Sequence, residues 1–320
     1  MDQGYVHVEI IASQSSKKAG SPCGDVVAYE RTVSSTTMVV SDGIGSGVKA
    51  HIAAQMCVSR LLELFRQGYS LRKAFESVVK TMEQAKGTDL PYAVFSVVRI
   101  LSDGVTTVLT YEMPQPVLVT PRYAQVLAQR SVTMAGTLTG ESNCHVDSGE
   151  GIVIVSDGIT QAGLGVGLAN GWTIEGASQY INDCLSSGAR VGDVPKCLLS
   201  QAKQVWKTTL GDDCTVALAA CRRGKTVNIL TGPPSNRMKD QATIKRFLTM
   251  EGAKVVCGGT TSKIVADFLG TEVKVELDKH STLCPARYEI KGIDLVTEGA
   301  VTLNQVYNIF DEDPDTFDEI

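Results

Sequence analysis

Apolar positions near the N-terminus first follow a strand period and then a helical one. Residues 5–12 and 26–33 alternate or cluster β-forming side chains, and 37–41 continues this pattern, which predicts three strands. From Val48 to Gly68 the apolar residues recur every three or four positions. This spacing predicts a helix that Gly68 ends.

The pattern continues with a second helix and then more strands. The predicted elements are an amphipathic helix at 71–87, strands at 92–101 and 105–111, a short strand at 117–120, and strand-like pieces within a polar loop over 121–150. The tripeptide 102-SDG-104 joins two of these strands as a hairpin turn.

Residues 152–221 bring back strong strands together with paired helices. The predicted order is a strand at 152–156, a glycine-rich loop at 163–171, helices at 174–186 and 194–208, and a buried strand after 211-GDDCTVALAAC-221. Antiparallel hairpins beside paired helices favour α+β layers with two sheets inside over alternating βαβ units.

The character of the chain changes after residue 225. Strands at 226–231 and 253–257 alternate with helices at 239–251, 262–269 and near 303–310. We therefore expect a first domain over 1–225, a small α/β accessory domain over 226–310, and an acidic tail over 311–320. The tail holds six carboxylates around one proline and is expected to be disordered.

Composition narrows the class of protein. Hydrophobic residues make up 43% of the chain and charged residues 20%, and the net charge is −5, which argues against nucleic-acid binding. No apolar stretch approaches the roughly 18 residues of a membrane span, so no membrane partner is expected. The nine cysteines form no C-x-x-C pair, and the N-terminus lacks the features of a signal peptide. These features predict a cytoplasmic protein with reduced thiols.

Aspartates gather at predicted strand ends in the first domain. Asp25 opens one strand, Asp42 and Asp157 end two others, and Asp212 with Asp213 precedes a fourth. Carboxylates are hard ligands, and several at one sheet edge would suit Mg²⁺ or Mn²⁺. The opposing interpretation is that Asp-Gly is a common turn dipeptide.

The glycines after Asp42 allow a second interpretation. Gly45, Gly47 and Ala50 match a G-x-G-x-x-A dinucleotide fingerprint between a strand and a helix, which would indicate a nucleotide-binding oxidoreductase. Against this, Asp42 puts negative charge where a pyrophosphate would lie. The next two segments are also both helices, so no second βα unit follows.

Four blocks carry a resemblance to a known family. In chain order, 24-GD-25, 41-SDGIGSGVKA-50, 155-VSDGIT-160 and 211-GDDCTVAL-218 resemble the metal-dependent type 2C protein serine/threonine phosphatases. The closer match is the bacterial branch named for the stage II sporulation protein E (SpoIIE) phosphatase. Its pattern is G-D, D-G-x-G-x-G-x-x-A, (S/T)-D-G and D-D-x-T-V. The resemblance covers roughly residues 5–222.

The resemblance implies a β-sandwich flanked by helices, in α-β-β-α layers, with a centre of two Mn²⁺ or Mg²⁺ ions. Carried over by position, Asp42 would bridge both ions, and Asp25 with the Gly43 carbonyl would complete one. Asp157 and Asp212 would complete the other, with Asp213 in support. Asp42 and Asp157 are the expected catalytic residues. Two such ions about 3.5–4 Å apart can activate water for in-line attack on a phosphate.

The expected activity is removal of phosphate from serine or threonine of a bacterial regulatory protein, for example an anti-sigma-factor antagonist. Ile44 stands where many eukaryotic members carry histidine, and the N-terminal arginine that they use on the phosphate has no clear counterpart. A catalytically inactive relative that keeps the fold is therefore the alternative. A homodimer is left open.

Two further features stay open. His51, on the first helix just past the glycine turn, is expected to have a helix-surface role. The stretch 258-GGTT-261 stands between a strand and a helix, where an anion could bind, but it lacks the Gly-Lys-Ser/Thr of a P-loop. A tight turn in a regulatory or dimerisation domain is the other interpretation.

Overall fold

The computed structural model describes residues 5–18, 20–45, 47–88, 90–207, 211–276, 287–299, 302–304 and 307. The chain separates into two compact units, Met1–Gly224 and Lys225–Ile320, and each is described by itself. Most of the helix expected near 303–310, and all of the acidic tail at 311–320, lie outside the described residues.

The first unit contains two antiparallel sheets and two pairs of long helices. Its strands are β1 (Val6–Ser15), β2 (Asp25–Arg31), β3 (Ser35–Gly43), β4 (Ala93–Leu101), β5 (Val105–Tyr111), β6 (Val117–Val119), β7 (Ala124–Val126), β8 (Arg130–Met134), β9 (Thr137–His145), β10 (Gly151–Val155) and β11 (Cys214–Arg223). Its helices are α1 (Val48–Arg66), α2 (Leu71–Gly87), α3 (Asp157–Thr160), α4 (Thr173–Ser186), the 3₁₀ helix η1 (Val191–Asp193) and α5 (Val194–Trp206).

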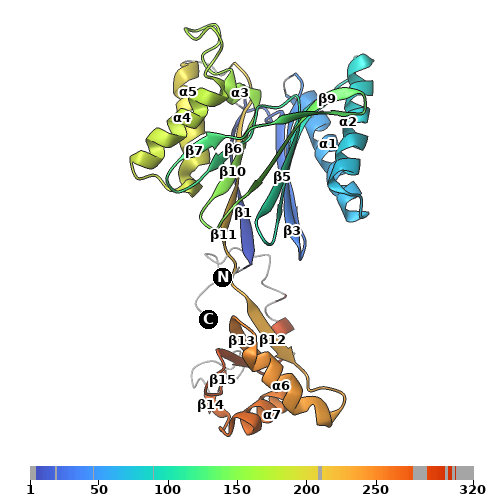
Figure 1. Ribbon diagram of the computed structural model, residues 1–320, viewed down its shortest axis with the longest axis vertical. Coiled ribbons are helices and arrows are strands. Elements are labelled where there is room, and N and C mark those ends of the chain that lie inside the picture. Colours follow the sequence, from blue (N-terminus) through green and yellow to red (C-terminus); the bar gives the residue numbers. More distant parts are fainter. Residues whose placement is uncertain are drawn as a thin grey trace. The chain divides into compact units, whose positions relative to one another are not determined.

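The sheets form the two inner layers of a four-layer stack. One sheet has the strand order β1-β11-β10-β6-β7 and the other β2-β3-β4-β5-β9-β8. In Figure 1, α1 and α2 cover the outer face of the second sheet, and α4 and α5 cover the outer face of the first. The expected α+β class with α-β-β-α layers is confirmed, and neither sheet closes into a barrel.

Side-chain alternation along β10 shows why both faces of its sheet are buried. Ile152 and Ile154 pack into the core shared with the other sheet and with α1 and α2. Val153 and Val155 pack into a separate core against α4 and α5. Successive side chains of a strand point to opposite faces, so a strand covered on both sides is apolar throughout. The uninterrupted apolar run at 152–155 follows from this arrangement.

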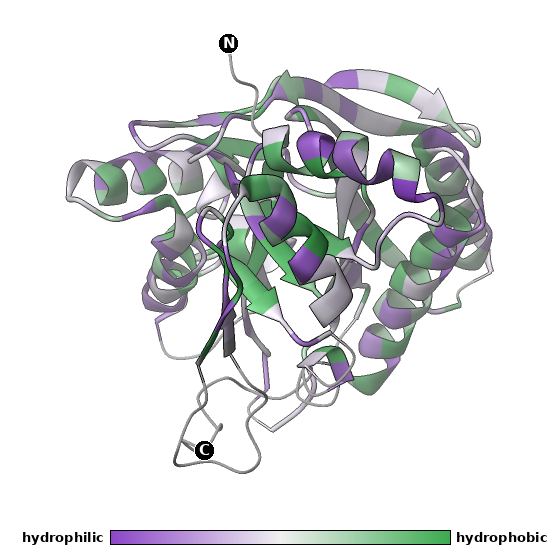
Figure 2. Cartoon of the chain, turned by 90° about the horizontal axis from the view of Figure 1, so that it is seen from below, coloured by the Kyte–Doolittle hydropathy of each residue, from purple (hydrophilic) through white to green (hydrophobic). Residues whose placement is uncertain are grey.

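The helices show the complementary pattern, with one apolar face and one polar face. Figure 2, coloured by hydropathy, shows hydrophobic and hydrophilic bands alternating along the helices. In α1 the buried side includes Ala53, Cys57 and Leu61, spaced by four residues. Residues at this spacing share one face of a helix, and burying that face against β3 supplies most of the helix's stability.

Three predicted element boundaries need correction. Strand β3 runs two residues beyond Ser41, so Asp42 and Gly43 pair with Val94 and Ala93 of β4 and do not lie in the turn. Asp157 opens the short helix α3, which the sequence did not predict. The predicted helix at 262–269 begins at Gly259, because Gly258 adopts a positive φ of 100° and the following residues form the first helical turn.

The second unit has a mixed sheet with the order β12-β13-β16-β15-β14. Its elements are β12 (Val227–Thr231), the 3₁₀ helix η2 (Arg237–Lys239), α6 (Asp240–Thr249), β13 (Ala253–Cys257), α7 (Gly259–Leu269), β14 (Lys274–Glu276), β15 (Arg287–Glu289) and β16 (Leu295–Thr297). Strands β12, β13 and β16 are parallel, and α6 and α7 pack together over Val256.

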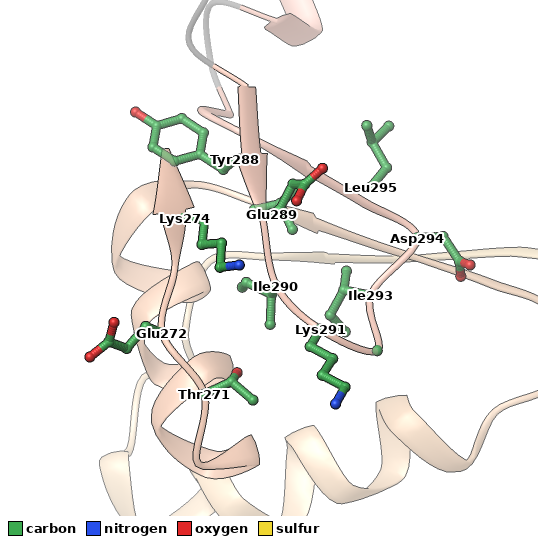
Figure 3. A pocket seen from close by; sticks show the side chains of 12 residues that line it. Thr271, Glu272, Lys274, Tyr288, Glu289, Ile290, Lys291, Ile293, Asp294 and Leu295 are labelled. Carbon is green, nitrogen blue, oxygen red and sulfur yellow. The ribbon is translucent and has the colours of Figure 1, made fainter. Parts of the chain in front are cut away.

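A cavity of about 860 Å³ opens in the second unit beside β14, β15 and the turn at 290–294. Lys274, Tyr288 and Ile290 are among its lining residues (Figure 3).

Within the part of the chain that the structure describes, no helix combines the length and the apolar character that crossing a membrane requires.

The aromatic cluster between α2 and the second sheet gives a test of the core. Phe75 lies 4.9 Å from Phe95, which lies 5.7 Å from Tyr111 (ring centroids). We expect Phe75→Ala to lower the free energy of unfolding by about 3–5 kcal/mol, because the substitution leaves a cavity in a buried core. Chemical denaturation measures this loss. Tyr69→Ala, at an exposed position just before α2, should cost less than about 0.5 kcal/mol; equal losses would contradict the packing.

Candidate metal centre

The pairing of β2 with β3 brings two of the predicted acids face to face. Asp25 is the direct cross-strand partner of Asp42 in this antiparallel pair. Both side chains are buried. Directly opposed residues have Cβ atoms roughly 4.5–5.5 Å apart, and like charges at such positions destabilise a sheet. This pair therefore costs folding free energy unless something compensates its charge.

Gly43, which follows Asp42, has no room for a side chain. A Cβ at this position would stand 2.0 Å from the carbonyl oxygen of Ala50, in the first turn of α1. The chain then reverses through Gly45 and Gly47, whose φ angles of 113° and 73° favour glycine. The glycine spacing thus serves a close contact between the end of β3 and the start of α1.

Asp157 reaches the same edge from the other sheet. It follows Ser156 at the end of β10 and is the first residue of α3. The Gln161 side chain donates a hydrogen bond from Nε2 to Asp157 Oδ2 at 2.8 Å. Gln161 lies four residues beyond Asp157, a spacing that places both on one side of a helical turn. The carboxylate is thereby held in a fixed orientation.

The neighbouring acids Asp212 and Asp213 have different surroundings. Asp213 accepts backbone hydrogen bonds from Lys17 N at 2.6 Å and from Gly24 N at 2.8 Å. Both of its oxygens are thus engaged in fixing the loop that leads to Asp25. Asp212 accepts a bond at Oδ1 from the Asp213 N–H at 2.9 Å, and its charge acts on Asp42 and Asp157.

The carboxyl pKa values of Asp25, Asp42 and Asp157 are all raised by burial and are influenced by neighbouring acids. Burial, reinforced by the charges of Asp25, Asp157 and Asp212, raises the pKa of Asp42 to about 10. Burial also raises the pKa of Asp25 to about 6. The pKa of Asp157 is raised by burial and by the Asp212 charge. Converging buried carboxylates strongly favour either protons or a cation.

The residues present fit a divalent cation in two respects. Both carboxylate oxygens of Asp25 are buried, and burial raises the pKa of this carboxyl although the Thr215 and Ser156 side chains oppose the rise. Burial of a charged group is costly unless the charge is paired. The Gly43 carbonyl oxygen lies 3.6 Å from the position of a Cβ on Gly24, so it faces the loop that carries Asp25. Carboxylate and carbonyl oxygens are the ligands that Mg²⁺ and Mn²⁺ prefer. As the side chains stand, no group of three or more His, Cys, Asp or Glu within the described ranges is gathered closely enough to form a ready-made ligand set.

Trp206 connects the turns that carry Asp157 and Asp212, a link that the sequence did not reveal. Its indole Nε1–H donates to the Gly158 carbonyl at 3.0 Å. The indole ring also covers Gly211, where a Cβ would stand 2.1 Å from it. Gly158 in turn packs so closely on Asp213 that a Cβ there would lie 2.0 Å from the Asp213 carbonyl oxygen. The buried indole fixes the distance between the two turns.

Other sequence interpretations have definite outcomes. The third Ser-Asp-Gly, 102–104, joins the antiparallel strands β4 and β5 as predicted, and Asp103 Oδ1 accepts a bond from Val105 N in the turn itself. His51, expected on the helix surface, places Nδ1 2.8 Å from the Cys23 carbonyl oxygen. The dinucleotide interpretation is wrong, because β3 and β4 are antiparallel and two helices separate them.

One cysteine also has the C-x5-R spacing of cysteine-dependent phosphatases, in 184-CLSSGAR-190. Cys184 lies in the last turn of α4, and its backbone carbonyl accepts from Ser187 N and Ala189 N. The end of a helix presents carbonyl groups, whereas a phosphate needs N–H donors. This stretch therefore does not form a phosphate-binding loop.

A known protein family matches the part of the chain that contains three of these acids. Residues 33–222 match the profile of the stage II sporulation protein E (SpoIIE) family. This span is more than half of the 320-residue chain and contains Asp42, Asp157 and Asp212. No curated protein matches the chain.

Solved structures show the same fold at low identity. A Bacillus subtilis structure of the PP2C phosphatase domain and a regulatory-domain fragment of SpoIIE is 16% identical, with a TM-score of 0.58, and the match covers 69% of this chain and 66% of that one, just under two thirds. The RsbU and RsbW domains of a Mycobacterium tuberculosis protein are 19% identical, with a TM-score of 0.57 over 76% and 68% of the two chains. A second Bacillus subtilis structure, of the SpoIIE phosphatase domain alone, has a TM-score of 0.52 at 16% identity and covers 70% and 96%.

The raised carboxyl pKa values predict an unusual pH dependence of stability. A carboxyl whose pKa is higher in the folded chain (Asp42, about 10) than in the unfolded chain binds protons preferentially in the folded state, so its contribution to stability falls as pH rises. In the presence of a chelator we expect Asp42→Asn to melt about 2–4 °C above the native chain at pH 8. The difference should shrink at pH 5.

Thermal unfolding followed by circular dichroism measures this effect. Asp103→Asn, in the hairpin turn of the same tripeptide, is the control and should not raise the melting temperature. A lower melting temperature for Asp42→Asn at pH 8 would contradict the described charge repulsion.

Proposed function

Because the chain belongs to the SpoIIE family of type 2C protein phosphatases, we propose that it hydrolyses phosphoserine or phosphothreonine of a protein with the help of divalent cations. The observation that carries this proposal is the gathering of four acids at one edge of the sheets, two of them buried and two half-buried, where three charges act on Asp42. Uncompensated burial of such a group costs several kcal/mol, on the order of 1.4 kcal/mol for each unit of pKa. Strongly shifted pKa values of this kind are concentrated at the functional sites of proteins.

The proposed ligand roles are those that the family resemblance implies, and the positions of the acids are compatible with them. Asp42 would bridge two Mn²⁺ or Mg²⁺ ions, with Asp25 and the Gly43 carbonyl on one side and Asp157 with Asp212 on the other. Asp25 lies opposite Asp42 on the neighbouring strand. Asp157 follows β10 and Asp212 lies in the loop that enters β11, and both of these strands belong to the first sheet. Bound cations would supply an activated water and neutralise phosphoryl oxygens.

The chain's own contribution is orientation. Gln161 fixes the rotation of the Asp157 carboxylate, and Asp213 fixes the Gly24 N–H and with it the start of β2. Trp206 holds the Asp157 and Asp212 turns together. Partners that hold ligands in place in this way commonly change metal affinity roughly 10- to 100-fold.

Position 44 bears on the last proton transfer. Ile44 is an aliphatic side chain directly after Gly43, so this position supplies no acid for the departing alkoxide. The same isoleucine supports the second candidate, a catalytically inactive relative that binds a regulator. The four acids are all present in this chain, and this favours the phosphatase.

The partner and the compartment are part of the proposal. A regulatory protein such as an anti-sigma-factor antagonist is the proposed substrate. One matched structure, from Mycobacterium tuberculosis, joins RsbU and RsbW domains. We place the protein in the cytoplasm, since all eight cysteines in the described ranges are free thiols. A homodimer is compatible with this function.

Two substitutions test the chemistry. Asp42→Asn and Asp157→Asn should each lower the Mn²⁺-dependent hydrolysis of p-nitrophenyl phosphate by more than about 100-fold, because each removes a ligand charge. Asp103→Asn, in the same tripeptide but in a hairpin turn, should keep full activity. Activity that survives both ligand substitutions would refute the proposed centre, and Mn²⁺ binding without hydrolysis in the native chain would favour the inactive relative.

The two tryptophans of the chain allow a matched test of positioning. Trp206→Phe removes the hydrogen bond to Gly158 but keeps an aromatic ring over Gly211, so Mn²⁺ affinity should fall about fivefold, the value of one hydrogen bond of roughly 1 kcal/mol. Trp172→Phe keeps an aromatic ring beside Tyr180 and removes no hydrogen bond to Gly158, so it should leave the affinity unchanged. Isothermal titration calorimetry measures both. An unchanged affinity in Trp206→Phe would show that the indole bond has no positioning role.

A further inference from the structure

An apolar row runs along the solvent-facing side of α1 and starts at the acidic edge. Val48, Ile52 and Met56 are 61%, 51% and 67% exposed, and Ile44, in the turn just after Gly43, is 43% exposed. Residues four apart lie on one side of a helix, so these three helical residues form a continuous row. A cluster of large exposed apolar side chains often marks an interaction site, whereas single exposed apolar residues are common and carry no such meaning.

The row is confined to the half of α1 that adjoins the acids. The next position of the same row, in the far half of α1, is Arg60, which is exposed and charged. Other exposed positions of the far half include Ser59 and Glu63. A partner lying along the whole helix would need apolar positions at both ends. The observed distribution instead favours a partner centred on the acidic edge.

A second apolar surface lies on the loop that follows Asp157. Leu164, Val166 and Leu168 are 44%, 43% and 40% exposed. The loop is tied to the site, because Leu164 N donates to the carbonyl of Gln161, which itself holds Asp157. Lys207 Nζ donates to the Val166 carbonyl at 3.2 Å. The chain segments that follow Asp42 and Asp157 thus both lead into exposed apolar residues.

We propose that these two surfaces together are the docking rim for the protein that carries the phosphorylated residue. The inference rests on the proposed function, since a protein whose phosphoserine reaches Asp42 and Asp157 must cover the residues next to them. The rim fits an apolar surface or an extended segment with apolar residues beside the phosphorylated one. Small phosphate esters do not reach it.

The dimensions suit a short segment. Val48 and Met56 are separated by eight residues, which corresponds to about 12 Å along a helix. An extended peptide advances about 3.3 Å per residue, so leucines within about four or five residues of the phosphoserine can contact the row. The rim therefore distinguishes substrates by the residues that flank the phosphate.

The test compares three substrates with Mn²⁺ present. Two phosphoserine peptides have equal length and charge; one carries leucines at the flanking positions and the other carries serines. The third substrate is p-nitrophenyl phosphate. For the native chain we expect kcat/KM to be about tenfold higher for the leucine peptide, the effect of partly burying one or two apolar side chains.

The double variant Ile52→Gln/Met56→Gln should reduce this preference to about two- to threefold, the share left to the loop at 164–168, and leave p-nitrophenyl phosphate hydrolysis unchanged. Glutamine is a good helix former, so α1 should keep its structure. Val166→Ser should reduce the preference about two- to threefold, consistent with a smaller loss of buried apolar area. Arg60→Gln, the next residue of the same row, is the matched control and should keep the full preference.

The outcomes separate the two proposals. Equal kcat/KM for both peptides in the native chain would overturn the docking rim while leaving the phosphatase intact. A preference that stays near tenfold in the double variant would do the same. Absence of hydrolysis of all three substrates would overturn the proposed function, and the docking rim with it.

Discussion

The gathering of four carboxylates at one edge of the two sheets, two of them buried and two half-buried, is the constraint on which the rest of the first unit depends. Asp25 and Asp42 oppose each other across β2 and β3, and Asp157 and Asp212 approach from the other sheet. Burial and mutual repulsion raise the pKa of Asp42 to about 10, so the folded chain carries a substantial electrostatic cost there. The apolar cores on both faces of the sheet that contains β10 and β11 offset that cost. Strands β10 and β11 are apolar on both faces because each face has its own core.

Close backbone packing is the second consequence of this arrangement. Gly43 lies against Ala50, Gly158 against Asp213, and Gly24 beside the Asp213 carboxylate, each at a distance that excludes a Cβ. These three contacts bind the ends of β3 and β10 and the beginning of β2 to the same small volume. Asp213 satisfies two backbone N–H groups there, and Trp206 closes the opposite side. The acids are therefore held by rigid elements, as a site that must orient charge requires.

Exposed apolar residues adjoin the acids on the surface of the first unit. The segments that follow Asp42 and Asp157 lead into exposed apolar residues, whereas the exposed positions in the far half of α1 are polar. A single set of turns thus links the candidate chemistry to the proposed docking rim. The second unit, with its parallel strands β12, β13 and β16, has its own core and a separate cavity. Phosphate binding at Gly258–Thr261, where α7 begins, stays a prediction.

The sequence by itself determined what depends on local pattern: the strands and helices, the α+β class, the family, and the acids at strand ends. Those features follow from side-chain period and from glycine at positions with special backbone needs, which neighbouring residues alone specify. The end of β3 was placed too early because pairing with β4, about 50 residues away, extends it through Gly43. The tertiary structure alone decided that Asp213 accepts two backbone hydrogen bonds and acts on Asp25, while Asp212 acts on Asp42 and Asp157. It also decided that Trp206 joins two turns and that Val48, Ile52 and Met56 face solvent. These roles depend on contacts between distant segments, such as Asp213 with Gly24 and Trp206 with Gly158, which no local spacing encodes.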